Sequence, residues 1–421
     1  MTDPSARPCI VVIGASLAGL RAAETLCQAD DPPEVVVIGA EPHRPYDRPP
    51  LSKKLLAGEW EADRVQLRQP EAFDQLDVEW RLGVAATGLT MGTPQQPHRT
   101  GGTVELGDGS SMVADGIVIA TGARPRMLPG QEEFDHVHLL RTLDDALALR
   151  ADLAAGEQRV VVIGAGFIGL EAASTARMLG NDVVVLEGAS SPLVRALGTE
   201  IGSAVALLHA DHGVEVRCDV RIESLTDDAV VLAGGERVPA DVVVVGIGVD
   251  PVTDWLDGSG LEVRDGVVCD EFLQARRLDG TPAPGVFAAG DVVRWPNSMF
   301  DEEMRVEHWT NAAEQGAHAA SNLLHSLRGD QPAAYAPLPF FWSDQYEHRI
   351  QFLGRAGADD DVRVVAGSIE ERKFLALFGR DGRLRGALGV NAPRWVMPMR
   401  KHFLDQTSWD DALTAAAELS A

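Results

Sequence analysis

A strand, a glycine-rich turn and a helix follow one another twice in this chain, in two copies about 150 residues apart. The first copy, CIVVIGASLAGLRAAETL, begins at Cys9, and the second, RVVVIGAGFIGLEAASTA, begins at Arg159. A valine-rich strand follows each copy, ending at Glu41 and at Glu187. A strand, turn, helix and strand in this order form the βαβ unit of a buried parallel sheet. Two such units predict two dinucleotide-binding domains instead of one long sheet.

Further segments extend this predicted α/β architecture. Apolar strands that end in glycine turns begin at Gly116, Asp241 and Gly285. The polar stretch 93–109 is typical of a small antiparallel meander, and the proline- and alanine-rich run 330–339 is typical of a linker.

Beyond the linker, alternating apolar residues around an Asp-Gly turn predict an antiparallel sheet, and a helical pattern begins at Asp405. We therefore expect an α/β chain with two Rossmann-like doubly wound domains and a C-terminal α+β domain. The first doubly wound domain is expected to be discontinuous, over residues 1–120 and 248–329. The second is expected over 121–247 and the C-terminal domain over 330–421.

Composition narrows the classes of partner. Lys and Arg number 37 against 63 Asp and Glu, so the formal charge of -26 disfavours nucleic acid and anionic membrane surfaces. No apolar run reaches the roughly 18 residues that span a bilayer, and the start of the chain lacks a signal-peptide pattern. The cysteines form no CxxC pair, which argues against a zinc, iron–sulfur or dithiol centre; they are Cys9, Cys27, Cys218 and Cys269. We expect a reduced, cytoplasmic protein without a bound metal.

The second glycine-rich turn fits the GxGxxG fingerprint at Gly164, Gly166 and Gly169. These glycines permit a tight turn, a close approach to a pyrophosphate and close packing of helix on strand. Glu187 follows the next strand, where a carboxylate can bind two ribose hydroxyls and repel the 2′-phosphate of NADP. NAD is therefore favoured over NADP, although Arg195 could accommodate the 2′-phosphate of NADP. The alternative for the whole motif is a glycine-rich turn that serves only packing and binds no nucleotide. Ile168 and Gly248 complete the predicted NAD-binding set.

The first turn departs from the fingerprint because Ser16 replaces its middle glycine between Gly14 and Gly19. Serine is small enough for this position, and its hydroxyl can donate to a phosphate. Ala18 belongs to the same turn, and Glu41 is the predicted ribose-binding acid, two residues later than ideal. Two dinucleotides in one chain predict a hydride relay, with NAD on one domain and FAD on the other.

Several blocks together resemble the FAD-dependent ferredoxin reductases of bacterial oxygenase systems, whose relatives include rubredoxin reductase and apoptosis-inducing factor. These blocks are PYDRPPLSK from Pro45 to Lys53, ATGARP, GLEAA, GVFAAGDV, HWTNAAEQG and FWSDQY. They lie in the family's order along essentially the whole chain. The resemblance implies a flavoprotein that passes a hydride from NADH to FAD and then single electrons to an iron–sulfur ferredoxin, which supplies a terminal oxygenase.

The resemblance also assigns residues to the flavin. Asp291 would bind the ribitol, Arg48 and Lys53 would lie beside the flavin, and Trp309 would face its pyrimidine edge. Thr121 and Gly122 join this set, and Trp342 would lie on the side of the C-terminal domain. Lys53 and Glu171 resemble the Lys–Glu pair near flavin N5. The plainer alternatives are a turn aspartate for Asp291, a surface lysine for Lys53 and a core side chain for either tryptophan.

Three other functions stay open at this stage. They are a rubredoxin reductase, a small-molecule flavin oxidoreductase, and a redox-sensing interaction protein like apoptosis-inducing factor. Residues 47–53 contain no cysteine, so the dithiol chemistry of disulfide reductases is not expected. We expect a monomer or a weak dimer.

Two histidine pairs, His209 with His212 and His136 with His138, are expected to be surface residues and not metal ligands.

Basic residues outnumber acidic ones in residues 43–58 and 391–402, which predicts a docking surface for an acidic ferredoxin. The basic residues are Arg44, Arg48, Lys53, Lys54, Arg394, Arg400 and Lys401.

Overall fold

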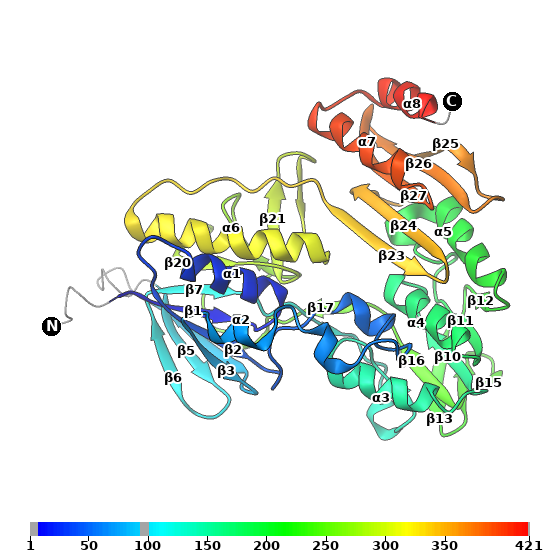
Figure 1. The fold of residues 1–421 in the computed structure, drawn as a ribbon, viewed down its shortest axis with the longest axis horizontal. Helices are drawn as coiled ribbons and strands as arrows, with labels where there is room; N and C mark the ends of the chain where they lie inside the picture. Colours follow the sequence, from blue (N-terminus) through cyan, green and yellow to red (C-terminus); the bar gives the residue numbers. More distant parts are fainter. Residues whose placement is uncertain (1–6, 93–100, 420–421) are drawn as a thin grey trace. The chain divides into compact units, whose positions relative to one another are not determined.

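The computed structural model describes residues 7–92 and 101–419, and the chain divides into two compact units (Figure 1). The first unit comprises Met1–Asp47, Gln66–Arg124 and Asp250–Pro337, and the second comprises Arg48–Val65, Pro125–Val249 and Leu338–Ala421. The α/β class, with parallel sheets and a C-terminal domain, is confirmed. The limits of the three expected domains stay a prediction.

The main sheet of the first unit has the strand order β19-β20-β7-β1-β2-β3. Its parallel strands are β20 (Pro282–Ala288), β7 (Gly116–Ile119), β1 (Cys9–Ile13), β2 (Glu34–Gly39) and β3 (Val78–Leu82), and β19 (Gln274–Arg276) is antiparallel. Valine and isoleucine fill β1, β2 and β7 because nearly every residue of these strands is buried.

Helix α1 (Leu17–Cys27) packs closely on α6 (Trp309–Arg328), and Figure 1 shows the two helices side by side. The approach depends on Gly316, because a Cβ atom there would lie 2.2 Å from the carbonyl oxygen of Ala18. Gly316 on α6 thus allows the first turn of α1 to lie close to α6.

The expected meander is present in the first unit. It consists of β4 (Ala86–Met91), β5 (Gly102–Leu106) and β6 (Ser111–Ala114), all antiparallel. It begins before the predicted stretch, and residues 93–100 of that stretch lie outside the described residues. A further three-stranded sheet has β18 (Val267–Val268), β21 (Val293–Asn297) and β22 (Glu302–Met304).

The second unit contains a parallel sheet in the order β12-β11-β10-β16-β9. Its strands are β12 (Glu215–Arg217), β11 (Asp182–Leu186), β10 (Arg159–Ile163), β16 (Val242–Val245) and β9 (Val137–His138). Its helices are α3 (Leu143–Leu153), α4 (Phe167–Met178) and α5 (Val194–Ala210). A small antiparallel sheet, β13 (Ile222–Thr226), β14 (Ala229–Leu232) and β15 (Arg237–Pro239), shares an apolar core with β10, β11 and β16.

The C-terminal sheet is antiparallel, as expected, in the order β23-β24-β27-β26-β25. The strands are β23 (Phe340–Gln345), β24 (His348–Gly354), β25 (Asp361–Ser368), β26 (Lys373–Arg380) and β27 (Arg383–Val390). Two helices follow, α7 (Pro393–Leu404) and α8 (Trp409–Glu418). The last helix begins later than Asp405 because the Ser408 hydroxyl caps it by accepting from the Asp411 amide.

The surface prediction is wrong for His209 and for His138. His209 on α5 is fully buried, with Nε2 3.0 Å from Gln345 Oε1 and Nδ1 3.1 Å from the Tyr346 hydroxyl. His212 stacks on the Tyr346 ring, and His138 is mostly buried beside Asp152. The sequence hides the burial of His209 because its partners, Gln345 on β23 and the following Tyr346, are more than 100 positions away. Among the described residues, no histidine, cysteine or carboxylate cluster can hold a metal.

Burial, opposed by the hydrogen bond to Gln345 and helped by the nearby His212, lowers the pKa of His209 from 6.5 to about 4, so the ring is neutral at pH 7. Between these two pH values the unfolded chain binds a proton at this position that the folded protein excludes. The stability that depends on the neutral ring is therefore complete above pH 6.5 and is lost as the pH falls toward 4. We expect the free energy of unfolding to fall by an amount on the order of 3 kcal/mol from this group.

Urea unfolding of wild type and His209→Phe at pH 7, 6, 5 and 4.5 measures this contribution. The variant should show a shallower loss of stability with acid than wild type, and His212→Phe, just after the end of α5, is the control. Parallel pH curves for wild type and His209→Phe would contradict the buried neutral ring.

Candidate functional site

The turn between β10 and α4 separates two kinds of glycine. A Cβ atom on Gly169 would lie 2.2 Å from the carbonyl oxygen of Gly164, so packing within the turn requires glycine there. Apart from its neighbours in the chain, no atom of the described residues lies within 4 Å of the Cβ position at Gly166. The fold itself does not need glycine at Gly166, and its open side leaves the backbone accessible to a pyrophosphate.

The start of α4 is suited to an anion. Its N-cap, Gly166, has no side chain to bind the free amides, and no acidic residue stands in its first turn. Ile168 on that turn is exposed. Gly248, at φ 106°, follows β16 in the same unit, and its carbonyl accepts from the Arg126 amide at 2.9 Å.

Glu187 lies directly after β11 and contacts this turn. One of its carboxylate oxygens accepts from the Ala165 amide at 2.6 Å, and the other accepts from the Ala189 amide at 2.8 Å. The carboxylate is half-buried. A ribose bound beside the turn would thus meet an acceptor held in place by backbone donors.

The first turn has the same construction in the first unit. Gly14, at φ 119°, would place a Cβ atom 2.0 Å from the Ala120 carbonyl oxygen, and Gly19 would place one 1.8 Å from that of Gly14. Ser16 is the N-cap of α1, and its hydroxyl makes no capping hydrogen bond. No acidic residue stands in the first turn of α1, and Ala18 lies against Gly290 and Gly316. The serine thus occupies the same helix-start position as Gly166.

The other candidates of the first unit lie at strand ends. Glu41 accepts a hydrogen bond from the Tyr46 hydroxyl. The Thr121 hydroxyl donates to the Val252 carbonyl at 2.7 Å, and the neighbouring Gly122 carbonyl accepts from the Val252 amide. Asp291 follows β20 and is half-buried.

Trp309 is the first residue of α6, and its Nε1 donates to Asp47 at 2.7 Å. The amide of Gly290, just before Asp291, donates to the buried side chain of Gln315 at 2.9 Å. Sequence reasoning missed Tyr46, Asp47 and Gln315 as partners, although all three stand inside the blocks PYDRPPLSK and HWTNAAEQG.

A polar cluster in the second unit surrounds Glu171. The Lys53 ammonium lies 2.6 Å from Glu171 Oε2, and the Ser52 hydroxyl donates to the same oxygen at 2.6 Å. The Ser343 hydroxyl donates to Glu171 Oε1 at 2.6 Å. Lys53 also donates to the Pro49 carbonyl at 3.1 Å. Three donors thus converge on the Glu171 carboxylate. Ser52 and Lys53 belong to the segment that follows Arg48, and Ser343 belongs to β23.

Burial makes these donors necessary. The side chain of Glu171 is 6% exposed and that of Lys53 is 18% exposed. A buried carboxylate is stable only where charged or hydroxyl donors replace its water. Sequence reasoning paired Lys53 with Glu171 by resemblance and missed Ser52 and Ser343, because a serine carries no signal of its role until its neighbours are known. Arg48 donates to the Arg141 carbonyl in the same unit.

None of the cysteines is activated. Burial raises the pKa of the Cys9 thiol to about 11 and also raises the pKa of the other three thiols. A thiol with a raised pKa is a poor nucleophile, so the chemistry of this site does not use sulfur.

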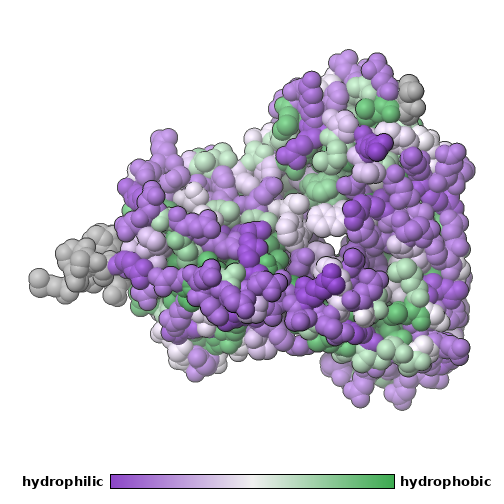
Figure 2. Space-filling model, in the orientation of Figure 1, coloured by the Kyte–Doolittle hydropathy of each residue, from purple (hydrophilic) through white to green (hydrophobic). Residues whose placement is uncertain are grey.

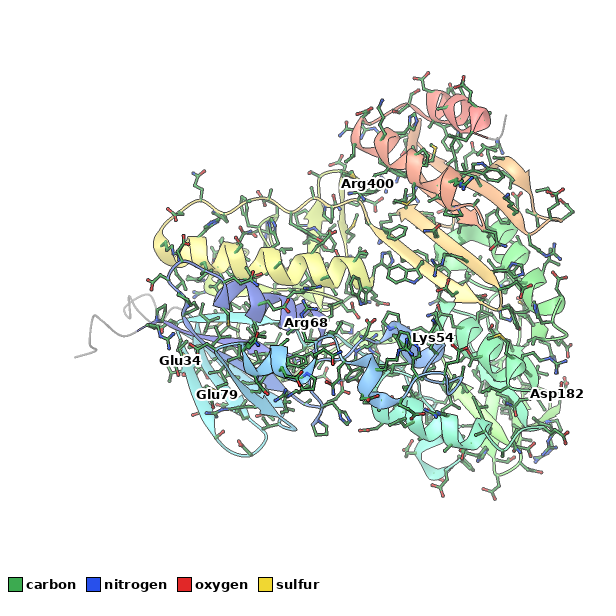
Figure 3. All side chains as sticks on the ribbon, viewed as in Figure 1. Glu34, Lys54, Arg68, Glu79, Asp182 and Arg400 are labelled. Carbon is green, nitrogen blue, oxygen red and sulfur yellow. The ribbon has the colours of Figure 1, made fainter. Side chains whose placement is uncertain are left out.

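Most basic side chains of residues 43–58 are already engaged inside the protein, so fewer are available to a partner than the composition indicates. Arg44 pairs with Asp74 at 2.8 Å, and Arg48 and Lys53 are engaged as described above. Lys54 is exposed, with its ammonium 5.1 Å from the centre of the Trp60 ring. Figure 3 labels Lys54 and Arg400. Arg394, Arg400 and Lys401 on α7 are exposed, and hydrophilic residues cover much of the face drawn in Figure 2.

Comparisons with known proteins identify the family. Residues 8–316 match the pyridine nucleotide-disulphide oxidoreductase family, and residues 340–420 match the reductase C-terminal family. The chain is 37% identical over 397 residues to the ferredoxin–NAD(+) reductase component of the anthranilate 1,2-dioxygenase system of Burkholderia cepacia, covering 93% of each chain. It is 36% identical to rhodocoxin reductase of Rhodococcus erythropolis, covering 93% of this chain and 88% of that protein.

Among solved structures, the covalent putidaredoxin reductase–putidaredoxin complex matches with a TM-score of 0.87 and 30% identity over 99% of both chains. The chain therefore belongs to the pyridine nucleotide-disulphide oxidoreductases, a family of enzymes that implies FAD and NAD(P)H. No helix among the described residues is long and apolar enough to cross a membrane.

The two kinds of glycine lead to opposite expectations. Gly169→Ala should lower the melting temperature by about 10 °C or more, or prevent folding, because its Cβ atom would overlap backbone. Gly166→Ala should keep the melting temperature within about 2 °C and weaken NAD⁺ binding about tenfold or more, since the methyl group fills ligand space. Thermal unfolding and NAD⁺ titration separate the two effects. Unchanged NAD⁺ affinity in Gly166→Ala would contradict this placement of the pyrophosphate.

Proposed function

We propose that this chain is a flavin-dependent NADH:ferredoxin reductase that supplies electrons to an oxygenase. The observation that carries the proposal is the Lys53–Glu171 pair, which lies in a chain with two glycine-rich dinucleotide turns and no cysteine among residues 47–53. The names of the relatives support the same activity. An iron–sulfur ferredoxin is then the direct partner, and the terminal oxygenase is the indirect one.

The proposed site residues keep the sets expected from the sequence. For FAD they are Gly14, Ser16, Ala18, Gly19, Glu41, Arg48, Lys53, Thr121, Gly122, Asp291 and Trp309. For NAD they are Gly164, Gly166, Ile168, Gly169, Glu187 and Gly248. The open side of Gly166, the uncapped start of α4 and the backbone-held carboxylate of Glu187 support these sets. We also retain three domains and a cytoplasmic location, which the free cysteines support.

FAD, when bound, accepts a hydride and releases electrons one at a time. The chain's own residues orient the reactants for that exchange. Lys53 supplies a positive charge, and Glu171 holds its ammonium in one place through a 2.6 Å ion pair. Ser52 and Ser343 satisfy the carboxylate so that it need not draw water into the site. When a nicotinamide displaces Lys53, the two serine hydroxyls keep the Glu171 carboxylate hydrogen-bonded.

A direct experiment tests the activity. Purified protein under anaerobic conditions is mixed with NADH, and bleaching of the flavin absorbance reports its reduction. A purified [2Fe–2S] ferredoxin, a rubredoxin and free FMN are then added separately. Fast reoxidation by the ferredoxin alone supports the proposal. Preference for the rubredoxin or for FMN would select one of the alternative functions instead.

Glu187 should decide between NADH and NADPH. Glu187→Ala should lower kcat/KM for NADH about ten- to hundredfold, because one charged hydrogen bond to the ribose is lost. Glu187→Arg should in addition raise activity with NADPH, since its charge attracts the 2′-phosphate. Steady-state rates with both nucleotides measure the ratio. An NADH/NADPH ratio that stays at the wild-type value in both variants would contradict the assignment.

Lys54 and the α7 arginines are the free part of the expected docking surface. Lys54→Glu and Arg400→Glu should each slow electron transfer to ferredoxin several-fold at low ionic strength, and the loss should shrink toward 0.5 M salt, where the Debye length is about 4 Å. Arg237→Glu, on β15, is a matched charge reversal that should have little effect. Ferricyanide needs no docking surface, so its reduction should change little in any variant. Equal losses with ferricyanide and ferredoxin would exclude docking as the cause.

A further inference from the structure

We infer that Gln345 and His209 are positioning residues for Glu171 and act on it through Ser343. They form a buried hydrogen-bond chain that ends at Tyr346 and fixes the carboxylate from the side opposite Lys53. The inference deepens the proposed function, since it depends on Glu171 taking part in that reaction.

The contacts form one continuous path within the second unit. Ser343 Oγ lies 2.6 Å from Glu171 Oε1, and Gln345 Nε2 lies 3.2 Å from Ser343 Oγ. Gln345 Oε1 lies 3.0 Å from His209 Nε2, and His209 Nδ1 lies 3.1 Å from the Tyr346 hydroxyl. Ser343 and Gln345 are two positions apart on β23, so their side chains share one face of the strand. Glu171 is contributed by α4 and His209 by α5.

The carboxylate sets the direction of every donor in this path. Glu171 can only accept, so the Ser343 hydroxyl donates to it and must accept from the Gln345 amide group. Gln345 Oε1 is then an acceptor, which requires the proton of His209 to be on Nε2. Nδ1 of the neutral ring accepts from the Tyr346 hydroxyl. All four hydrogen bonds thus point toward Glu171.

Burial excludes water from the path, so no solvent molecule can replace one of its hydrogen bonds. Glu171 is 5% exposed, and Ser343, Gln345 and His209 are fully buried. Burial also lowers the pKa of His209, which keeps the ring neutral as the path requires. The backbone holds the far end, because the Tyr346 amide donates to Ser174 on α4 at 2.6 Å. When Lys53 leaves Glu171, the Ser343 donor therefore stays in place.

A double-mutant cycle in the holoenzyme tests the inference. Ser343→Ala removes the direct donor, and Gln345→Leu removes the group that orients it. We expect each variant to slow flavin reduction by NADH about three- to tenfold in stopped-flow measurements, with KM for NADH within about twofold of wild type. The double variant should be no slower than Ser343→Ala, since Gln345 acts only through that hydroxyl. His212→Phe lies just after α5 and touches the path only by stacking on the Tyr346 ring, so it should stay within about twofold of wild type.

A second measurement observes the histidine rings of the wild-type protein directly. Nitrogen-15 spectra of histidine-labelled wild type should show one neutral ring protonated at Nε2 down to about pH 5, and His209→Phe assigns that signal where the variant folds. A charged ring or an Nδ1 proton at pH 7 would overturn the path. Multiplicative rate losses in the double variant would overturn the positioning role. If NADH fails to reduce even the wild-type flavin, the proposed function fails. The tautomer of the His209 ring then decides by itself whether the hydrogen-bond path from Tyr346 to Glu171 exists.

Discussion

A carboxylate removed from water must find donors inside the protein, and Glu171, whose side chain is 6% exposed, meets this requirement with three of them. Its donors come from Ser52, Lys53 and Ser343, which lie 118 or more positions away in the sequence. Each donor fixes one segment against α4: the turn that follows Arg48 on one side and β23 on the other. The position of the C-terminal sheet within its unit is therefore tied to the group that holds Lys53.

The sequence predicts the parallel sheets well because their signal is local. The runs VVVIG in β10 and IVVIG in β1, each ending in a glycine turn, predict these strands without any knowledge of their neighbours. The same locality explains the glycine turns, where spacing alone identifies Gly164, Gly166 and Gly169. The blocks PYDRPPLSK and GLEAA resemble one family, and that resemblance pairs Lys53 with Glu171 although more than 100 positions separate them.

What the sequence could not predict depends on contacts between distant segments. His209 stands in an ordinary helical pattern, and only the packing of Gln345 and Tyr346 on α5 makes it a buried neutral ring. Arg44 counted as a free cation in the sequence, yet it pairs with Asp74. Formal charge describes a chain, whereas the charge available to a partner is what remains after internal pairs have formed. That difference reduces the first basic stretch to Lys54.

The pairing of β7 with β20 has a consequence for how the protein is made. Val118 lies opposite Phe287, so the first sheet closes only after nearly 170 further residues have been added. The strands of the second parallel sheet, from Val137 to Val245, all lie within that interval. As the chain leaves the ribosome, the later sheet can be complete while the earlier one still exposes an unpaired edge. The first sheet must therefore wait until β20 has been synthesised, and a nascent-chain chaperone has most to protect at β7.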